Sequence, residues 1–153
     1  MINVNSLNKS FGELHILKDI NETIEKGEKV VVVGPSGSGK STFLRCLNCM
    51  EDPTSGSIIF NGVDIADMKV DINGHRQRMG MVFQHFNLFN NKTVIENIML
   101  APVYVEKKRM KKLRRHNPNN EKIKSTKEIK ADAKAQATEL LERIGLEEKA
   151  NAY

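Results

Sequence analysis

The apolar and polar positions along the chain predict an α/β protein. Residues 1–7 and 16–24 alternate loosely between apolar and polar side chains, which is typical of strands with one buried face. Residues 30–33 are four consecutive valines, and a run without polar alternation predicts a strand buried on both faces. An Asn-Gly dipeptide divides the apolar positions of residues 57–65 and predicts a β-hairpin, because both turn positions need a positive φ. Residues 80–83 predict another short buried strand.

Helices are predicted where capping signals precede apolar stripes. Residues 41–50 form one candidate, directly after a glycine-rich loop. Thr93-x-x-Glu96 is a capping box, so a second helix is expected to begin near Thr93, and Pro102 is expected to end or kink it. Residues 106–124 have no apolar periodicity, which predicts a solvated, flexible loop.

A further helix is predicted in the last thirty residues or so of the sequence. Ser125-x-x-Glu128 is its capping box, and Gly145 ends it. Its apolar stripe consists of Ile129, Ala133, Ala137, Leu140, Leu141 and Ile144. Earlier in the chain, the polar stretch 67–78 predicts one helical turn.

The composition is that of one ordinary domain with an uneven distribution of charge. No apolar run approaches the roughly 20 residues that a membrane-spanning helix needs, and there is no signal-peptide core, so we expect a cytoplasmic protein. The net charge is +5, yet residues 107–130 hold eleven Lys or Arg against two Glu, which gives that segment +9. The other residues sum to −4, so the basicity belongs to one inserted-looking tract.

One stretch carries the pattern of a phosphate-binding loop. Gly34, Gly39, Lys40 and Ser41 fit G-x-x-x-x-G-K-[ST] between the valine run and the helix over 41–50. Glycines let backbone N–H groups approach phosphate oxygens, and the helix N-terminus adds unpaired donors with a partial positive charge. The Lys40 ammonium can reach the β- and γ-phosphates, and the Ser41 hydroxyl can ligate Mg²⁺. The alternative is a glycine-rich turn with an incidental lysine, which the strand–loop–helix order disfavours.

Two other candidates have a structural as well as a functional interpretation. Cys46 and Cys49 form a C-x-x-C inside the helix, whereas redox pairs stand at a helix start and a structural zinc needs two more ligands. We therefore expect both cysteines to be small core residues. Phe11, in a predicted polar loop, is either a satellite core residue or a stacking platform.

Four features of the chain occur together. They are Phe11, the phosphate loop, the Asn61-Gly62 hairpin, and G-M-V-F-Q-H-F-N-L-F followed by T-V-I-E-N-I. In this combination the chain resembles an ATP-binding-cassette (ABC) ATPase and is most similar to the ATPase subunits of bacterial importers for polar amino acids. The resemblance covers residues 1–103 well and residues 128–153 more loosely. It implies a P-loop NTPase fold with an N-terminal antiparallel β-subdomain, an incomplete parallel core and a partial helical subdomain.

The resemblance also implies ligands and a role for each candidate residue. Phe11 would stack on adenine, and Gln84 would be the Q-loop glutamine that contacts Mg²⁺ and the attacking water. Ser41 and Gln84 would contact the metal, so ATP and Mg²⁺ are the expected ligands. The full ATP-binding set is Phe11, Gly34, Ser36, Gly37, Ser38, Gly39, Lys40, Ser41, Thr42 and Gln84. The structural alternative for Gln84 is an ordinary polar residue at a strand end.

Several parts of the family pattern do not occur in this sequence. Family members continue beyond a tyrosine like Tyr153 into an L-S-G-G-Q signature, an Asp-Glu strand and a switch histidine. Without these parts we expect binding of ATP with negligible turnover, since phosphoryl transfer depends on positioning and charge stabilisation. Core strands would also be missing beside residues 30–33 and 80–83, so we expect unpaired apolar edges and a marginal or rearranged fold.

The resemblance suggests how the chain is organised and what it assembles with. We expect residues 1–92 to form the N-terminal part of the nucleotide-binding domain, and residues 93–153 to form a partial helical subdomain with a basic insertion at about 106–124. The implied partners are transmembrane permease subunits, a substrate-binding receptor and a second copy of the nucleotide-binding subunit, at the cytoplasmic face of the cell membrane.

The basic tract 107–130 allows a different class of function, the binding of nucleic acid or of an anionic surface. The tract has no interleaved aromatic residues and no recognised module, which argues against nucleic acid. A solvated loop near anionic lipid is the structural alternative. A small phosphate-loop kinase, a third possibility, leaves Gln84 and its surroundings unexplained.

Overall fold

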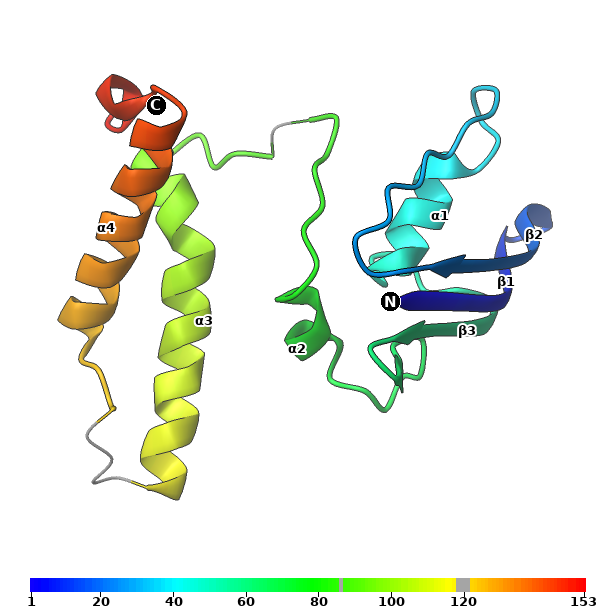
Figure 1. Ribbon diagram of the computed structural model, residues 1–153, viewed down its shortest axis with the longest axis horizontal. Helices are drawn as coiled ribbons and strands as arrows, with labels where there is room; N and C mark the ends of the chain where they lie inside the picture. The colour runs from blue at the N-terminus through cyan, green and yellow to red at the C-terminus, as the bar shows by residue number, and fades with distance from the viewer. Residues whose placement is uncertain (86, 118–121) are drawn as a thin grey trace. The chain divides into compact units, whose positions relative to one another are not determined.

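The chain forms two compact units, Met1–Val82 and Phe83–Tyr153, which we call the sheet unit and the helical unit (Figure 1). The computed structural model describes residues 1–85, 87–117 and 122–153. The sheet unit contains β1 (Ile2–Phe11), β2 (Leu14–Ile24), α1 (Lys40–Leu47), β3 (Ser55–Phe60), β4 (Val63–Asp64) and α2 (Ile72–Arg76). The helical unit contains α3 (Val94–His116), α4 (Thr126–Arg143) and the 3-10 helix η1 (Glu147–Lys149).

The sheet unit is built on an antiparallel sheet with the strand order β2-β1-β3-β4. Strand β1 pairs with β2 from Ile2 opposite Ile24 to Phe11 opposite Leu14, and it pairs with β3 along its other edge. The first two predicted strands are confirmed, although β1 continues beyond the predicted residues 1–7. The two central strands, β1 and β3, each have a partner on both edges, and β1 joins the long strand β2 to the rest of the sheet.

The predicted hairpin is formed by β3 and β4. Asn61 and Gly62 connect the two strands with φ of 50° and 82°, which are the positive values that an Asn-Gly turn requires. The Asp64 carboxylate accepts hydrogen bonds from the N–H groups of Ile58 and Ala66, both at 3.1 Å. This short hairpin is therefore held by a side chain as well as by backbone pairing.

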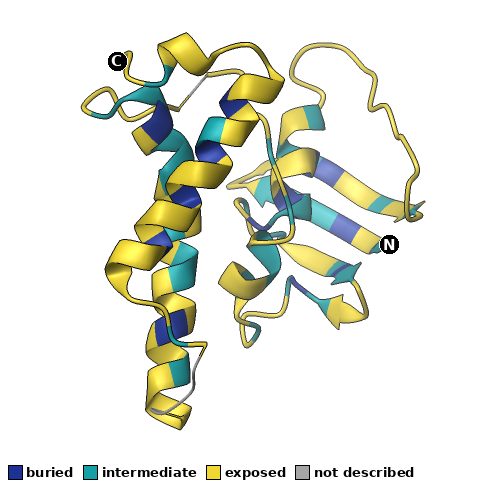
Figure 2. Cartoon of the chain, turned by 60° about the vertical axis from the view of Figure 1, so that its left-hand side comes forward, coloured by how far each residue is buried: buried dark blue, intermediate teal, exposed yellow. Residues whose placement is uncertain are grey.

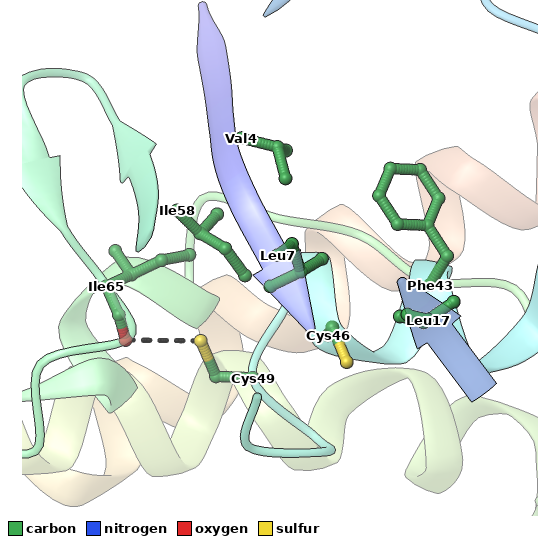
Figure 3. Close-up of a cluster of buried hydrophobic side chains, with 8 residues drawn as sticks. All are labelled: Val4, Leu7, Leu17, Phe43, Cys46, Cys49, Ile58 and Ile65. Carbon is green, nitrogen blue, oxygen red and sulfur yellow. Dashed lines mark hydrogen bonds between the residues drawn. The ribbon is translucent and has the colours of Figure 1, made fainter. Parts of the chain in front are cut away.

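The core of the sheet unit lies between the sheet and α1 (Figure 3). Its buried side chains are Val4, Leu7, Leu17, Phe43, Cys46, Cys49, Ile58 and Ile65. Each fully buried aliphatic or aromatic side chain of this kind contributes about 1.5–3 kcal/mol relative to an exposed one. Helix α1 ends where Cys49 takes a φ of 52°, and Arg76 of α2 donates to the carbonyl oxygens of Asn48 and Cys49 there. The one-turn helix α2 lies within the predicted stretch 67–78.

The two cysteines are core residues, as predicted. Cys46 and Cys49 are 0% and 4% exposed, and the Cys49 thiol donates to the carbonyl oxygen of Ile65 at 3.1 Å. Burial raises the pKa of both thiols, to about 11 for Cys49, although Arg76 beside Cys49 acts in the opposite direction. Neither thiol has the lowered pKa of a redox-active cysteine.

Two predicted strands do not form, and no parallel pairing occurs among the described residues. Residues 30–33 are irregular, with Val31 and Val33 81% and 84% exposed, and residues 80–83 are irregular as well, with Val82 98% exposed. A strand needs a neighbour to accept and donate its backbone hydrogen bonds, and the described chain offers neither segment one. The prediction of strands here is wrong because apolar side chains alone do not pair a backbone.

The helical unit is a hairpin of α3 and α4, and both of its predicted capping boxes are confirmed. The Thr93 hydroxyl accepts from the Glu96 N–H at 3.4 Å, and the Glu96 carboxylate accepts from the Thr93 N–H at 3.0 Å. Ser125 and Glu128 make the same reciprocal pair, with distances of 3.2 and 2.6 Å. No helix in the described ranges is long and apolar enough to cross a membrane.

Buried positions recur along one side of α4 (Figure 2). They are Ile129, Ala133, Ala137 and Leu141. The predicted stripe also included Leu140 and Ile144, which are 49% and 65% exposed. Leu140 lies about 100° around the helix from the buried Leu141, and Ile144 is the C-cap residue beyond the end of α4, so neither belongs to the buried face.

Helix α3 continues through Pro102 to His116, so Pro102 does not end the helix, and the predicted loop over 106–124 is wrong as far as residue 116. Residues 122–124 are non-helical, as predicted, and residues 118–121 lie outside the described residues. Lys, Arg, Met and Leu are good helix formers, and Met110 is only 2% exposed. The burial of Met110 could not be predicted from the sequence, because charged residues surround it there.

Asn97 holds the segment that leads into α3. Its side-chain oxygen accepts from the Phe89 N–H at 2.9 Å, and its side-chain amide donates to the carbonyl oxygens of Phe89, Lys92 and Thr93 at 3.0–3.2 Å. The division of subdomains between residues 92 and 93 stays a prediction.

A pair of glycine substitutions tests how closely β3 approaches β1. Gly56 has a φ of 94°, and a Cβ there would lie 2.4 Å from the Ser6 carbonyl oxygen; Gly62 has a φ of 82° and nothing within 4 Å. We expect Gly56→Ala to lower the free energy of unfolding by about 2–4 kcal/mol, and Gly62→Ala by about 1 kcal/mol. Urea denaturation followed by circular dichroism measures both. Equal losses would mean that backbone conformation alone sets the effect.

The buried thiols predict slow alkylation and a loss of stability at high pH. Because the folded pKa of Cys49 is about 11 against an ordinary value of 9.0, the unfolded chain loses this proton first, and stability falls as the pH rises from 9.0 towards 11. Cys49→Ala should lose that part of the pH dependence in urea denaturation.

Iodoacetamide should modify Cys46 and Cys49 slowly in the folded chain and rapidly in urea, and equal rates by mass spectrometry would contradict their burial.

Candidate functional site

The predicted phosphate loop leads directly into α1 and packs against β2. Gly39 is the N-cap of α1 with a φ of 91°, and the Phe43 N–H donates to its carbonyl oxygen at 2.8 Å. A Cβ on Gly39 would lie 2.8 Å from a methyl carbon of Ile16 and 3.1 Å from one of Leu17. A glycine at this position therefore allows the loop to reach the strand and the helix to begin there.

The start of α1 presents backbone donors without partners. Within the described chain, the N–H groups of Gly37, Gly39, Lys40 and Ser41 have no acceptor, and no side chain caps the helix. Consecutive free N–H groups at a helix N-terminus, together with the partial positive charge of the helix dipole, favour a bound anion. The first turn of α1 contains no acidic residue that would oppose such an anion.

The Lys40 ammonium folds back over the loop. Its Nζ donates to the carbonyl oxygens of Gly34 and Pro35 at 2.8 and 2.7 Å. These neutral acceptors keep the ammonium close to the phosphate loop, next to the N–H groups that have no partner. Phosphate oxygens are stronger acceptors for an ammonium than carbonyl oxygens are, because both partners are then charged.

Hydroxyl groups surround the free N–H groups. Ser36, Ser38 and Ser41 are exposed and Thr42 is half-buried, and none of the four hydroxyls is hydrogen-bonded within the described residues. An ammonium, free backbone amides and hydroxyls form a donor set that fits a polyphosphate, and the Ser41 hydroxyl is suited to a Mg²⁺ ion bound to one. The described residues contain no cluster of three or more His, Cys, Asp or Glu side chains for a metal held by protein alone.

Phe11 stands at the end of β1, not in a loop as predicted, and is 47% exposed. The Lys9 ammonium lies 4.7 Å from the centre of its ring. Lys9 also donates to the Asp52 carbonyl oxygen at 2.7 Å and lies 3.5 Å from a Glu51 carboxylate oxygen. Lys9 was absent from the predicted set, although residues two apart on a strand share a face and the pattern could have indicated it.

The candidates fall into both units of the chain. Phe11 and all of the phosphate-loop residues belong to the sheet unit, where Phe11 pairs with Leu14 and the same strand β2 contacts Gly39 through Ile16. Gln84 belongs to the helical unit, at an exposed bend. The structure thus brings together the phosphate-binding groups on one unit, and the role of Gln84 stays a prediction.

Sequence comparisons agree with this geometry. The family model described as ABC transporter matches residues 17–153. The glutamine transport ATP-binding protein GlnQ of Bacillus subtilis (strain 168) is 48% identical over 153 residues, which are 100% of this chain and 55% of that protein. The arginine transport ATP-binding protein ArtM of the same strain is 47% identical with the same coverage. The chain therefore spans about half the length of the curated relatives it matches.

Solved structures confirm the predicted fold class. A dimeric ATP-binding cassette in a post-hydrolysis state, bound to ADP and phosphate, matches with a TM-score of 0.72 and 30% identity over 99% of this chain and 60% of that chain. A component of an ABC transporter complex from Clostridium perfringens matches with a TM-score of 0.68 and 26% identity over 99% of this chain and 53% of that chain. The predicted P-loop NTPase fold is thereby confirmed, while its parallel core strands are not formed here.

Proposed function

The chain belongs to the ABC transporter family, and we propose that it is the ATP-binding part of an importer for polar amino acids. Two relatives that match along the whole chain carry glutamine transport and arginine transport in their names, which supports this substrate class. The observation that carries the proposal is the start of α1, where free backbone N–H groups and the Lys40 ammonium meet.

The loop would bind the phosphates of ATP through charge and backbone donors. When Lys40 turns from the carbonyl oxygens of Gly34 and Pro35 to a phosphate oxygen, its ammonium exchanges two neutral acceptors for a negatively charged one, which strengthens the interaction. The N–H groups at the start of α1 would hold the remaining oxygens, and the Ser41 hydroxyl would contact Mg²⁺. Bound ATP–Mg²⁺ supplies a transferable phosphoryl group, and the loop contributes positioning and charge neutralisation.

Phe11 would serve as the platform for adenine. Phe11 is half exposed and the Lys9 ammonium lies over its ring, so we propose that the exposed part of the ring stacks on the base. The Lys9 ammonium is held by Glu51 and the Asp52 carbonyl oxygen. We therefore expect it to stay beside the ring when a nucleotide binds. Stacking on an aromatic face recognises a base by its π-surface and adds to the phosphate contacts.

The helical unit would connect this site to the transport machinery. We propose that Gln84 contacts Mg²⁺ and the attacking water, and that α3 and α4 dock on transmembrane permease subunits at the cytoplasmic face of the membrane. A substrate-binding receptor and a second nucleotide-binding subunit would complete the assembly. The dimeric form of one matching cassette supports the last of these partners.

Replacing Lys40 tests the phosphate loop. Lys40→Ala removes the charged donor, and we expect a fluorescent ATP analogue with Mg²⁺ to bind about 30- to 100-fold more weakly, as judged by anisotropy. Lys26→Ala removes the same charge from an exposed turn and should leave affinity unchanged within about twofold. If Lys40→Ala bound the analogue as tightly as the unsubstituted chain, this loop would not be the ATP site.

A second pair of variants separates stacking from packing at the β1–β2 turn. Phe11→Ala should weaken ATP binding about tenfold while leaving the affinity for inorganic triphosphate unchanged, since only ATP carries a base. Leu14→Ala, at the position paired with Phe11, should change neither affinity. Calorimetric titration measures both ligands, and an equal loss for the two in Phe11→Ala would assign Phe11 a structural role.

A further inference from the structure

A second concentration of positive charge lies in the helical unit, on residues separate from the phosphate loop. The C-terminal half of α3 and the start of α4 border an open, shallow hollow of about 410 Å³. Five basic side chains line it. Lys124 precedes α4, and the other four belong to α3: Lys107, Lys111, Arg114 and Arg115. This hollow exists because α3 continues as a helix beyond Pro102.

Helical geometry places the four α3 cations on one face. Residues i, i+4, i+7 and i+8 of an α-helix project from the same side, and Lys107, Lys111, Arg114 and Arg115 have this spacing. Like charges at i and i+4 repel each other, so this arrangement disfavours the helix until an anion is bound. Lys108 and Lys112 belong to the same helix but do not line the hollow.

The charge of the hollow is only partly compensated. Lys124 pairs with Asp132 at 2.6 Å, and Arg114 donates to the Lys124 carbonyl oxygen at 3.2 Å. The charged groups of Lys107, Lys111 and Arg115 form no ion pair and donate no hydrogen bond within the described ranges. Two nearby carboxylates are engaged elsewhere, Glu106 with Arg109 at 2.8 Å and Glu128 in the capping box of α4.

The floor of the hollow is fixed by packing. Met110 and Ile129 are 2% and 3% exposed, and both line the hollow between the basic side chains. The Lys124 N–H also lies 3.3 Å from the Met110 sulfur, which ties the chain before α4 to α3. The cations are thus carried by a packed pair of helices, which reduces the ordering that a ligand must impose.

We propose that this hollow binds a phosphate-bearing anion with at least two negative charges, of the phosphomonoester or pyrophosphate class. Guanidinium forks and lysine ammonium groups together suit the several oxygens of such an anion. The volume lies within the range of small-ligand sites, and the described residues that line it include no aromatic side chain on which a nucleobase could stack. The ligand is either a soluble phosphate compound or the phosphate head of a lipid, which share this chemistry.

Charge-matched variants distinguish this site from diffuse attraction. All titrations use the full chain with Lys40→Ala, which weakens binding at the phosphate loop in every variant alike, and inorganic pyrophosphate is the probe. Lys111→Gln/Arg115→Gln should weaken binding about tenfold or more, whereas Lys108→Gln/Lys112→Gln, which removes the same charge from α3 outside the hollow, should change it less than about threefold. Circular dichroism checks that α3 stays helical, and amide shifts in the parent chain should change at α3 and residues 124–129 whether or not a variant folds.

Vesicles identify the source of the phosphate. Co-sedimentation with phosphatidylcholine vesicles that contain phosphatidic acid, and dependence on Lys111 and Arg115, would support a lipid source; pyrophosphate binding without vesicle binding would support a soluble one. Equal losses in the two double variants would overturn the proposal, as would binding to neither probe. If oligothymidylate bound more tightly than pyrophosphate and both double variants lost this binding equally, the basic residues would attract nucleic acid non-specifically and the proposal would be wrong.

Discussion

Backbone pairing is the constraint on which the rest of this structure depends. Strand β1 is hydrogen-bonded on both edges, and from it Val4 and Leu7 enter the core that α1 covers. The valine run at residues 30–33 has side chains well suited to a buried strand, yet it is irregular and exposed because the described chain provides no partner for it. Hydrophobicity decides what is buried only after the N–H and C=O groups have been satisfied.

This constraint determines how the phosphate loop is supported. On its downstream side the loop is fixed, because Gly39 packs on Ile16 and Leu17, and Phe43 and Cys46 anchor α1 in the core. On its upstream side residues 30–33 are irregular, and the Lys40 ammonium donates to the carbonyl oxygens of Gly34 and Pro35. The groups that would bind phosphate are those carried by the better-packed side. The arrangement of free N–H groups and Lys40 that we propose as the phosphate site therefore forms without the parallel sheet.

Features of the fold could be predicted where the cause lies within a few residues. The Asn61-Gly62 turn, both capping boxes and the loop pattern are local, because each depends on side chains no more than seven residues apart. The strand at residues 30–33 depends on a distant partner and could not be decided from its own sequence. Helix α3 beyond Pro102 depends on Met110 packing in the hairpin with α4, which charged neighbours concealed. Lys9 could have been included, since the alternation of a strand places it beside Phe11.

The two proposed anion sites would meet the same electrostatic requirement in two physically different ways. The phosphate loop uses backbone dipoles at the start of α1, so a glycine and a helix end suffice, and only Lys40 contributes a full charge. The hollow of the helical unit uses full charges on side chains, which repel one another and so require a helix rigid enough to keep them on one face. That rigidity is supplied at the floor, where Met110 and Ile129 are buried. Anion binding at the proposed hollow would thus be coupled to the α3–α4 packing, whereas at the loop it would be coupled to the core beneath α1.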